Sequence, residues 1–230
     1  MNLRFNGRIL EEKSKVKHLG HTICNFRRDI FDCENMINDL KTRSNIIVSQ
    51  FRFLSIESIR KIFNTQCRHF YGGSLISLDS KSIKAVDTSW RVCSRRVLGL
   101  SPRTHNLFIP YLINAVPPSI EISCRMINFF KCGLENKNNA VSNIFRNCLM
   151  CGDSIMFRNV NSIARKLYLP IQSIFDLPKK LILNDLFPKN SELLEICNII
   201  TEVLMLKNKE LSTILAEDEI LILLEDLCTR

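Results

Sequence analysis

Residues 80–98 constrain the fold more than any other segment, because their pattern is that of an amphipathic α-helix with a defined end. At about 100° per residue, the apolar side chains fall in one stripe: Ile83, Val86, Trp90, Cys93 and Val97. The opposite stripe holds Lys84, Arg91 and Arg95, with Thr88 between them. Gly99 suits a helix C-terminus, and Pro102 prevents continuation. We expect Trp90 in a core rather than stacked on a base, and the cationic face in contact with either a polyanion or only solvent.

Charge is divided unevenly along the chain. Residues 1–105 hold 19 Lys and Arg against 9 Asp and Glu, a net charge of +10, whereas residues 106–230 hold 13 and 14, a net charge of −1. Within the second part, residues 191–230 carry 3 basic and 9 acidic residues, a net charge of −6. All four histidines lie in the basic part: His18, His21, His69 and His105. This distribution predicts that residues 1–105 face phosphate groups, while the tail faces solvent or a basic partner.

The ten cysteines do not indicate a secreted, disulfide-rich protein. Most of them lie within periodic apolar runs, where a free cysteine acts as a small hydrophobic residue. The first residues lack the apolar core and cleavage site of a secretory signal. No run approaches the roughly 18 apolar residues of a membrane span. We therefore expect an intracellular location, nuclear or cytoplasmic, without membrane insertion.

The first 28 residues predict β-structure. Leu3–Leu10 carries Asn6-Gly7 between short apolar flanks, which is the strongest local signal for a β-hairpin. Val16–Ile23 alternates in polarity and is predicted as a third strand, in which Gly20 permits the close approach of another backbone.

After residue 28 the apolar spacing becomes helical. A helix of about six or seven turns is predicted from Ile30, with three- and four-residue steps broken only by Ser44. Its stripe comprises Ile30, Cys33, Ile37, Leu40, Ile47, Phe51 and Leu54. Ser55 is the predicted cap of the next helix, which Gly72-Gly73 closes. The stripe of that helix comprises Ile59, Phe63, Cys67 and Phe70.

The rest of the chain continues this helical pattern. With only seven glycines and seven prolines, the composition also favours helices. Helices are predicted near residues 106–114, 118–134, 140–150, 155–169, 191–207 and 216–228. The predicted fold class is mainly α, a helical bundle with a short N-terminal β-hairpin or three-stranded element. Four regions are expected, 1–28, 29–75, 76–150 and 151–230, with the clearest boundary at Cys151-Gly152-Asp153.

Several short motifs follow one another in the order found in one protein family. They are Asn6-Gly7, Lys17–Ile23, Cys67–Gly72, Trp90–Leu100, Thr104-His105, Pro117, Arg125, Phe129-Phe130 and Asn138–Val141. In order and spacing, residues 2–147 resemble the region that follows the polymerase palm in reverse transcriptases of LINE-type (non-LTR) retrotransposons. The remaining C-terminal residues match no motif of that family.

The resemblance implies roles for three segments. Lys17–Ile23 corresponds to the primer grip, a hairpin that supports the primer end, residues 29–75 to the thumb, and residues 76–150 to the helical region beyond it. The implied nucleic-acid-binding residues are His18, Gly20 and His21 of the grip, and Lys41, Arg43, Arg60, Lys61 and Arg68 of the thumb. The cations of the basic segment complete the set: Lys84, Arg91, Arg95 and Arg103. Such surfaces hold duplexes through backbone charge and shape.

The sequence lacks the catalytic signature of such a polymerase. Polymerase chemistry requires carboxylates that hold two metal ions about 4 Å apart, and this chain has no Asp-Asp pair. Palm, fingers, endonuclease and the Cys-Cys-His-Cys knuckle of many such elements are also missing from it. We therefore expect a non-catalytic fragment without a cofactor or metal.

Three other groupings resemble ligand sites, and none is predicted to bind a metal. Cys148 and Cys151 form a C-x-x-C pair without two further ligands at suitable spacing. His18 and His21 would point to opposite faces of one strand. Glu217-Asp218-Glu219 is explained more simply by the preference of acids for the first turn of a helix.

Three functional hypotheses remain open. The first is sequence-tolerant binding of RNA, or of an RNA–DNA duplex, through residues 1–105. The second is a helical interaction or scaffold module, in which residues 191–228 bind a protein partner or a second copy through broad apolar faces. The third is a gene remnant without a selected function. A steep salt dependence of nucleic-acid binding favours the first hypothesis.

Overall fold

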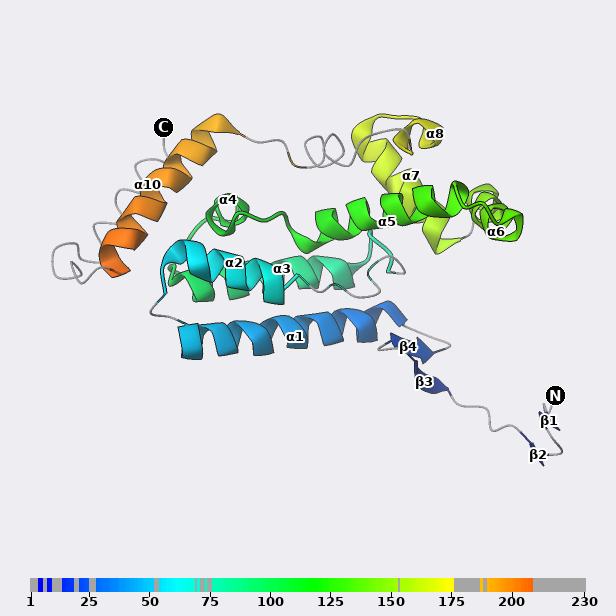
Figure 1. The fold of residues 1–230 in the computed structure, drawn as a ribbon, viewed down its shortest axis with the longest axis horizontal. Helices are drawn as coiled ribbons and strands as arrows, with labels where there is room; N and C mark the ends of the chain where they lie inside the picture. The colour runs from blue at the N-terminus through cyan, green and yellow to red at the C-terminus, as the bar shows by residue number, and fades with distance from the viewer. Residues whose placement is uncertain are drawn as a thin grey trace.

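A computed structural model of the chain shows a mainly helical protein, as predicted (Figure 1). It describes residues 4–5, 8–9, 14–18, 21–24, 28–51, 54–68, 70, 73, 76–152, 154–175, 187 and 190–208. The first helices are α1 (Arg28–Phe51), α2 (Ile56–Gln66) and α3 (Lys81–Leu98). They are followed by α4 (Ile109–Ile113), α5 (Pro118–Leu134), α6 (Asn139–Met150), α7 (Ile155–Leu167), α8 (Ile171–Ile174) and α10 (Ser191–Asn208). The helix predicted over 216–228 lies outside the described residues.

Four short strands precede the helices and pair as two antiparallel ladders. The strands are β1 (Arg4–Phe5), β2 (Arg8–Ile9), β3 (Lys15–His18) and β4 (His21–Cys24). The single strand predicted over Val16–Ile23 is corrected by the β3–β4 pairing, in which His18 lies opposite His21. Alternating polarity looks the same in one long strand and in two short ones, so it did not reveal the reversal. Asn6-Gly7 and Gly20 lie outside the described residues, so the predicted turn and the role of Gly20 stay predictions.

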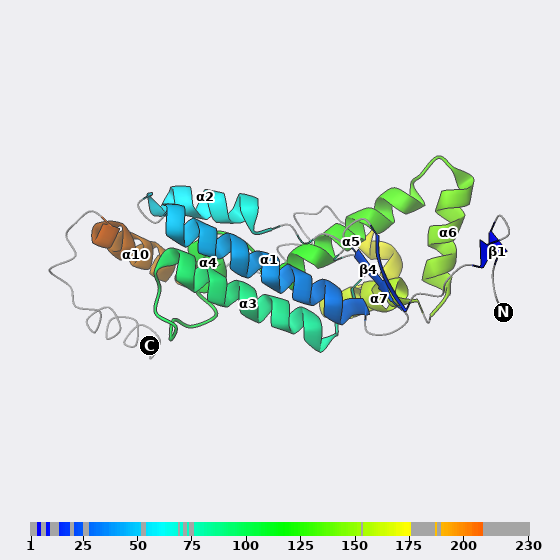
Figure 2. The ribbon, with the colours of Figure 1, turned by 90° about the horizontal axis from the view of Figure 1, so that it is seen from below.

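α1 and α3 form the base of the bundle, where they lie side by side and run in the same direction (Figures 1 and 2). The face that α1 buries comprises Asp32, Cys33, Met36, Leu40, Ser44 and Ile47. Ser44 was predicted to interrupt this stripe, but it is buried within it because its hydroxyl donates to the Lys41 carbonyl at 3.0 Å. Ile30 and Leu54, predicted as core residues, are 37% and 39% exposed.

α2 begins as predicted and ends earlier. The Ser55 hydroxyl accepts a hydrogen bond from the Ser58 backbone N–H, so Ser55 is the expected cap. α2 ends at Gln66 rather than at Gly72-Gly73. Cys67 and Phe70 still lie in the core, because the irregular chain after α2 folds back onto it. The apolar residues therefore keep a helical spacing beyond Gln66, although α2 itself ends there.

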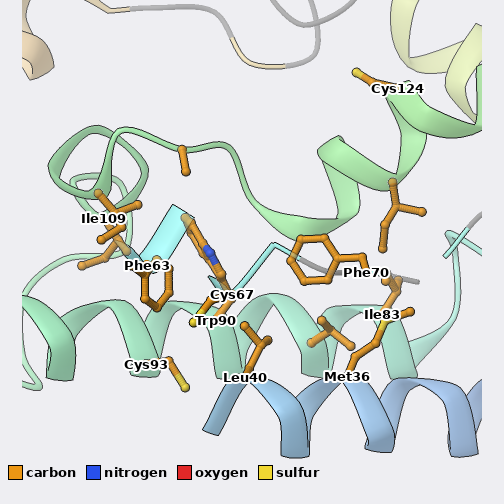
Figure 3. Close-up of a cluster of buried hydrophobic side chains, with 14 of the residues drawn as sticks. Met36, Leu40, Phe63, Cys67, Phe70, Ile83, Trp90, Cys93, Ile109 and Cys124 are labelled. Atoms are coloured by element: carbon orange, nitrogen blue, oxygen red, sulfur yellow. The ribbon is translucent and has the colours of Figure 1, made fainter. Parts of the chain in front are cut away.

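α3 matches its prediction at both ends and on its buried face. The Ser80 hydroxyl accepts from the Ile83 backbone N–H at 3.2 Å. Gly99 closes the helix with φ of +66°, a left-handed conformation that suits glycine. All five residues of the predicted stripe are buried, and Trp90 is 0% exposed beside Phe63 and Cys67 (Figure 3). Trp90 is thus a core residue, as expected.

The hydrophobic core continues across the boundary predicted at residues 151–153. Asn159 of α7 is buried, and its side chain binds the segment before α3 through two hydrogen bonds. Its Oδ1 accepts from the Leu78 N–H at 2.9 Å, and its Nδ2 donates to the Ile76 carbonyl at 2.7 Å. Val160 and Ile163 belong to the same apolar cluster as Trp90. α7 and α3 are therefore parts of one packed body.

α10 lies at one end of the molecule, where it packs on α4 and α2 (Figure 1). Its buried residues are Cys197, Ile200 and Thr201. Among the described helices, α10 included, none is long and apolar enough to cross a membrane.

The eight cysteines whose side chains are described are free thiols. Five of them are buried: Cys33, Cys67, Cys93, Cys124 and Cys197. These five fill space between helices as small apolar side chains do, which is the role that the sequence predicted.

Candidate nucleic-acid interface

The outward side of α3 is a cationic face, defined by Lys81, Lys84, Arg91, Arg95 and Arg96. Lys81, Lys84 and Arg96 are exposed, and Arg91 and Arg95 are half-buried. The first turn of α3 contains no acid, although the positive end of the helix dipole favours acids there. Lys81 and Lys84 instead add positive charge to that end. The first turn of α3 therefore contains no negative charge to balance Lys81 and Lys84, and a bound anion would supply one.

Asp87 is the only acid of α3, and it is directed at α5. Its carboxylate accepts hydrogen bonds from the Ser119 backbone N–H at 2.9 Å and from the Ser119 hydroxyl at 2.7 Å. Burial raises the pKa of Asp87, while these bonds and the charges of Arg91 and Lys166 act against the rise. Asp87 thus caps the first turn of α5, and the cationic face keeps its charge.

Arg95 belongs to the cationic face but has partners within the chain. Its Nε and Nη2 donate to the Thr104 carbonyl at 3.0 and 2.8 Å, and Nη2 also donates to Asn106 Oδ1 at 2.5 Å. Burial and the neighbouring charge of Arg91 lower the pKa of Arg95. Arg95 therefore anchors the loop after α3, a role that its sequence position did not indicate. Arg103, in the same loop, is exposed.

Two arginines predicted to face a duplex instead connect elements of the fold. The Nε of Arg60 donates to the Leu112 carbonyl, and its Nη2 donates to Thr201 Oγ1 at 2.7 Å. Arg60 thereby joins α2 to α4 and α10. The Nη1 of Arg43 donates to the Gln66 carbonyl at 2.9 Å, which joins α1 to the end of α2. These guanidinium groups therefore have structural partners, whereas no side-chain partner is described for the exposed Lys41 and Lys61.

Arg68 is held by Glu121, a buried acid of α5. Its Nη2 lies 2.5 Å from Glu121 Oε2, and the Nε of Arg125 lies 3.0 Å from Glu121 Oε1. Arg125 also donates to the Arg68 carbonyl at 3.1 Å. One carboxylate therefore binds two arginines and fixes the segment after α2 against α5.

We expect Glu121→Gln to lower the free energy of unfolding at neutral pH by about 1–2 kcal/mol, below the value for a fully buried pair because both arginines are partly exposed. Burial raises the pKa of Glu121, but Arg68 and Arg125 outweigh it and hold that pKa below its ordinary value of 4.5. Such a carboxylate stabilises the fold above its unfolded-state pKa and loses this contribution as the pH falls through the lowered pKa.

Urea denaturation of wild type and E121Q checks this expectation. The difference in unfolding free energy should be present at neutral pH and shrink on acidification below the ordinary pKa of 4.5. A difference that stays constant over this range would contradict the assigned ion pairs.

The other predicted residues come from α1, α2 and the β3–β4 ladder. Lys41 is exposed on α1, and the charges of Lys41 and Arg96 both act on Cys93, which places them at the same α1–α3 seam. Lys61 is exposed on α2. The backbones of His18 and His21 are opposite one another in the β3–β4 ladder, while their side chains lie outside the described part.

Three cations of α7 were missed by the sequence analysis. Arg158, Arg165 and Lys166 are exposed and line a groove beside α7. Their spacing of seven and eight residues puts them on one side of a helix whose other side buries Val160 and Ile163. That spacing was visible in the sequence, but the near-neutral charge of residues 106–230 directed attention to the first half of the chain.

Cys148 and Cys151 can be examined for further metal ligands, whereas the side chains of His18 and His21 lie outside the described part. Within the described ranges, no three His, Cys, Asp or Glu residues are grouped so that they could hold a metal ion. Cys148 is half-buried at the end of α6, and Cys151 is exposed just after it. The expectation that His18 and His21 lie on one strand is corrected above, and their lack of a metal stays a prediction.

Comparison with known proteins gives no assignment. The chain matches no family model, no curated protein and no solved structure. A functional proposal therefore depends on the surface chemistry of this chain and on the resemblance of its motifs.

Proposed function

We propose that the cationic face of α3 binds the phosphate backbone of RNA or of an RNA–DNA duplex without reading its sequence. The proposal combines the motif resemblance to the region beyond the palm of LINE-type reverse transcriptases with the charge on this face. Binding through backbone charge requires cations that reach solvent and are not neutralised by the protein. Lys81, Lys84 and Arg96 are exposed, and in the described part of the chain none of them takes part in an ion pair. The proposed role is binding only, because the chain carries no Asp-Asp pair for polymerase chemistry.

The main support for the proposal is that the positive charges of α3 destabilise the helix itself. Lys81 and Lys84 lie in the first turn, where positive charge is unfavourable by about 0.3–1 kcal/mol per residue. Arg91 and Arg95 lie four residues apart on one face, a spacing at which like charges repel. Burial lowers the pKa of Arg95, and the charge of Arg91 lowers it further. A bound polyanion relieves both repulsions.

We place this activity in a reducing compartment of the cell, the nucleus or the cytoplasm. The eight cysteines whose side chains are described are free, and five are buried as core residues, which supports a chain folded with reduced thiols.

Lys84→Ala/Arg91→Ala should weaken binding of a labelled RNA–DNA hybrid and lower the slope of log K against log salt by about two units, one for each lost phosphate contact. Folding should be nearly unaffected, since alanine favours helices and neither side chain has a described hydrogen bond. Fluorescence anisotropy at several salt concentrations measures both quantities.

Lys137→Ala/Arg146→Ala is the matched control. It removes the same charge from exposed positions in the α5–α6 loop and on α6. Equal losses for the two double variants would mean that only net charge matters, and unchanged binding in Lys84→Ala/Arg91→Ala would exclude the cationic face.

One observation favours the second hypothesis, a helical interaction module. Leu194 and Ile199 of α10 are each 45% exposed, although Cys197, Ile200 and Thr201 of the same helix are buried against the chain itself. Leu194→Ser/Ile199→Ser in the full chain should abolish self-association if these exposed residues contact a second copy. Sedimentation of the two proteins measures that difference.

A further inference from the structure

A groove beside α7 is the second concentration of positive charge on the molecule. Its volume is about 490 Å³, and its lining residues are Asp79, Arg158, Asn161, Ser162, Arg165 and Lys166. Five of the six come from α7, at positions that share one side of the helix. The opposite side packs into the core through Val160, Ile163 and Ala164. The groove therefore lies on a helix whose other side is anchored in the core.

The positive charge of the lining residues favours an anionic ligand. Every lining residue carries a charged or polar group, so the groove offers several hydrogen-bonding and cationic groups to a ligand. Asp79, its one acid, accepts a hydrogen bond from the Ser162 hydroxyl at 3.0 Å. In the part of the chain that the structure describes, Arg158, Arg165 and Lys166 take part in no ion pair. Two guanidinium groups and an ammonium group thus remain available for phosphate oxygens.

The groove adjoins the cationic face of α3. Asp87 lies on α3, and the charges of both Arg91 and Lys166 act on its carboxylate. Both cations therefore act on Asp87, whose negative charge offsets part of theirs. The geometric link between the two elements is Asp79, just before α3, which accepts a hydrogen bond from Ser162 of α7 at 3.0 Å. α3 and α7 also share the core, which fixes the distance between their charged sides.

We propose that the α7 groove binds backbone phosphates of the same nucleic acid that the cationic face of α3 holds. This inference rests on the proposed function and extends its surface into residues 151–230, where the sequence indicated no phosphate contact. A strand that leaves the α3 face toward α7 meets Arg165 and Lys166 in the last turn of α7, and Arg158 about two turns earlier on the same side of the helix. Serine and asparagine in the lining add neutral donors to phosphate oxygens.

Lysine acetylation footprinting on the full chain tests the location of the contact. A short RNA–DNA hybrid should protect both Lys84 and Lys166 from acetylation, while Lys137, in the α5–α6 loop, stays reactive. Protection of Lys84 without Lys166 would overturn the inference and leave the proposed function standing. If neither lysine is protected, the proposed function fails, and the inference fails with it.

Arg158→Gln/Arg165→Gln tests the contribution of the groove to affinity. The variant should lower the salt slope for the hybrid by about two units, as Lys84→Ala/Arg91→Ala does, and the two losses should add in the quadruple variant. The control is again Lys137→Ala/Arg146→Ala. An unchanged slope for Arg158→Gln/Arg165→Gln, with a reduced slope for Lys84→Ala/Arg91→Ala, would restrict binding to α3 and overturn the inference.

Discussion

Trp90→Ala should lower the free energy of unfolding by about 3–5 kcal/mol, the largest single effect that we expect. The indole is 0% exposed in the centre of the core, where α1, α2, α3 and α4 all contribute buried side chains (Figure 3). Removing it leaves a cavity that rigidly packed helices cannot close. Urea denaturation followed by far-ultraviolet circular dichroism measures the loss, because the variant lacks the only tryptophan.

Trp90→Phe separates the packing of the ring from its polar group. Trp90 Nε1 is buried and has no hydrogen-bond acceptor among the described residues. An unpaired buried N–H destabilises the fold by about 1–3 kcal/mol, so replacing the indole by phenyl removes that penalty while losing some volume. We expect Trp90→Phe to be less than half as destabilising as Trp90→Ala. Equal effects of the two changes would contradict this account of the core.

Asn159→Ala should lower the free energy of unfolding by about 2–5 kcal/mol, because it leaves two buried backbone groups unpaired. These are the Leu78 N–H and the Ile76 carbonyl, both in buried residues of the segment before α3. The loss should appear in one cooperative transition, since α7 and α3 share a core. Differential scanning calorimetry measures both the stability and the number of transitions.

Asn143→Ala provides the control for helix propensity. Asn143 is exposed on α6, so the same substitution removes no described buried hydrogen bond. Its effect should be near zero or slightly stabilising. Two separate transitions in Asn159→Ala, with only one weakened, would show that residues 76–150 and 151–230 fold independently.

Local signals in the sequence predicted individual helices well. α3 has a serine cap, a clean apolar stripe and a glycine at its end, and all three are found where they were expected. α1 was harder, because its buried face includes Asp32 and Ser44, which look like solvent-facing residues. Burial of Ser44 depends on a hydrogen bond to Lys41 that hydropathy does not encode. The joining of α7 to α3 through Asn159 depends on partners more than 80 positions away.

The predicted position of a cation agreed with the structure only where its side chain is exposed. Lys84 was correctly expected on the outward side of its helix, opposite Trp90. The arginines Arg60 and Arg68 have equally suitable spacing, but their acceptors at Leu112 and Glu121 lie 52 and 53 positions away. Sequence shows that a cation is present and not whether the fold has already supplied its partner. The cations of α7, which form no ion pair among the described residues, were overlooked because residues 106–230 are close to neutral overall.

Burial of the thiols also determines which cysteines react with electrophiles and oxidants. Burial raises the pKa of Cys67 to about 12 and that of Cys197 to about 11, so both stay protonated and unreactive near neutral pH. Among the described cysteines, alkylating reagents find exposed sulfur only at Cys132 and Cys151. As long as the helices stay packed, attack on one of the five buried thiols requires the chain to open first.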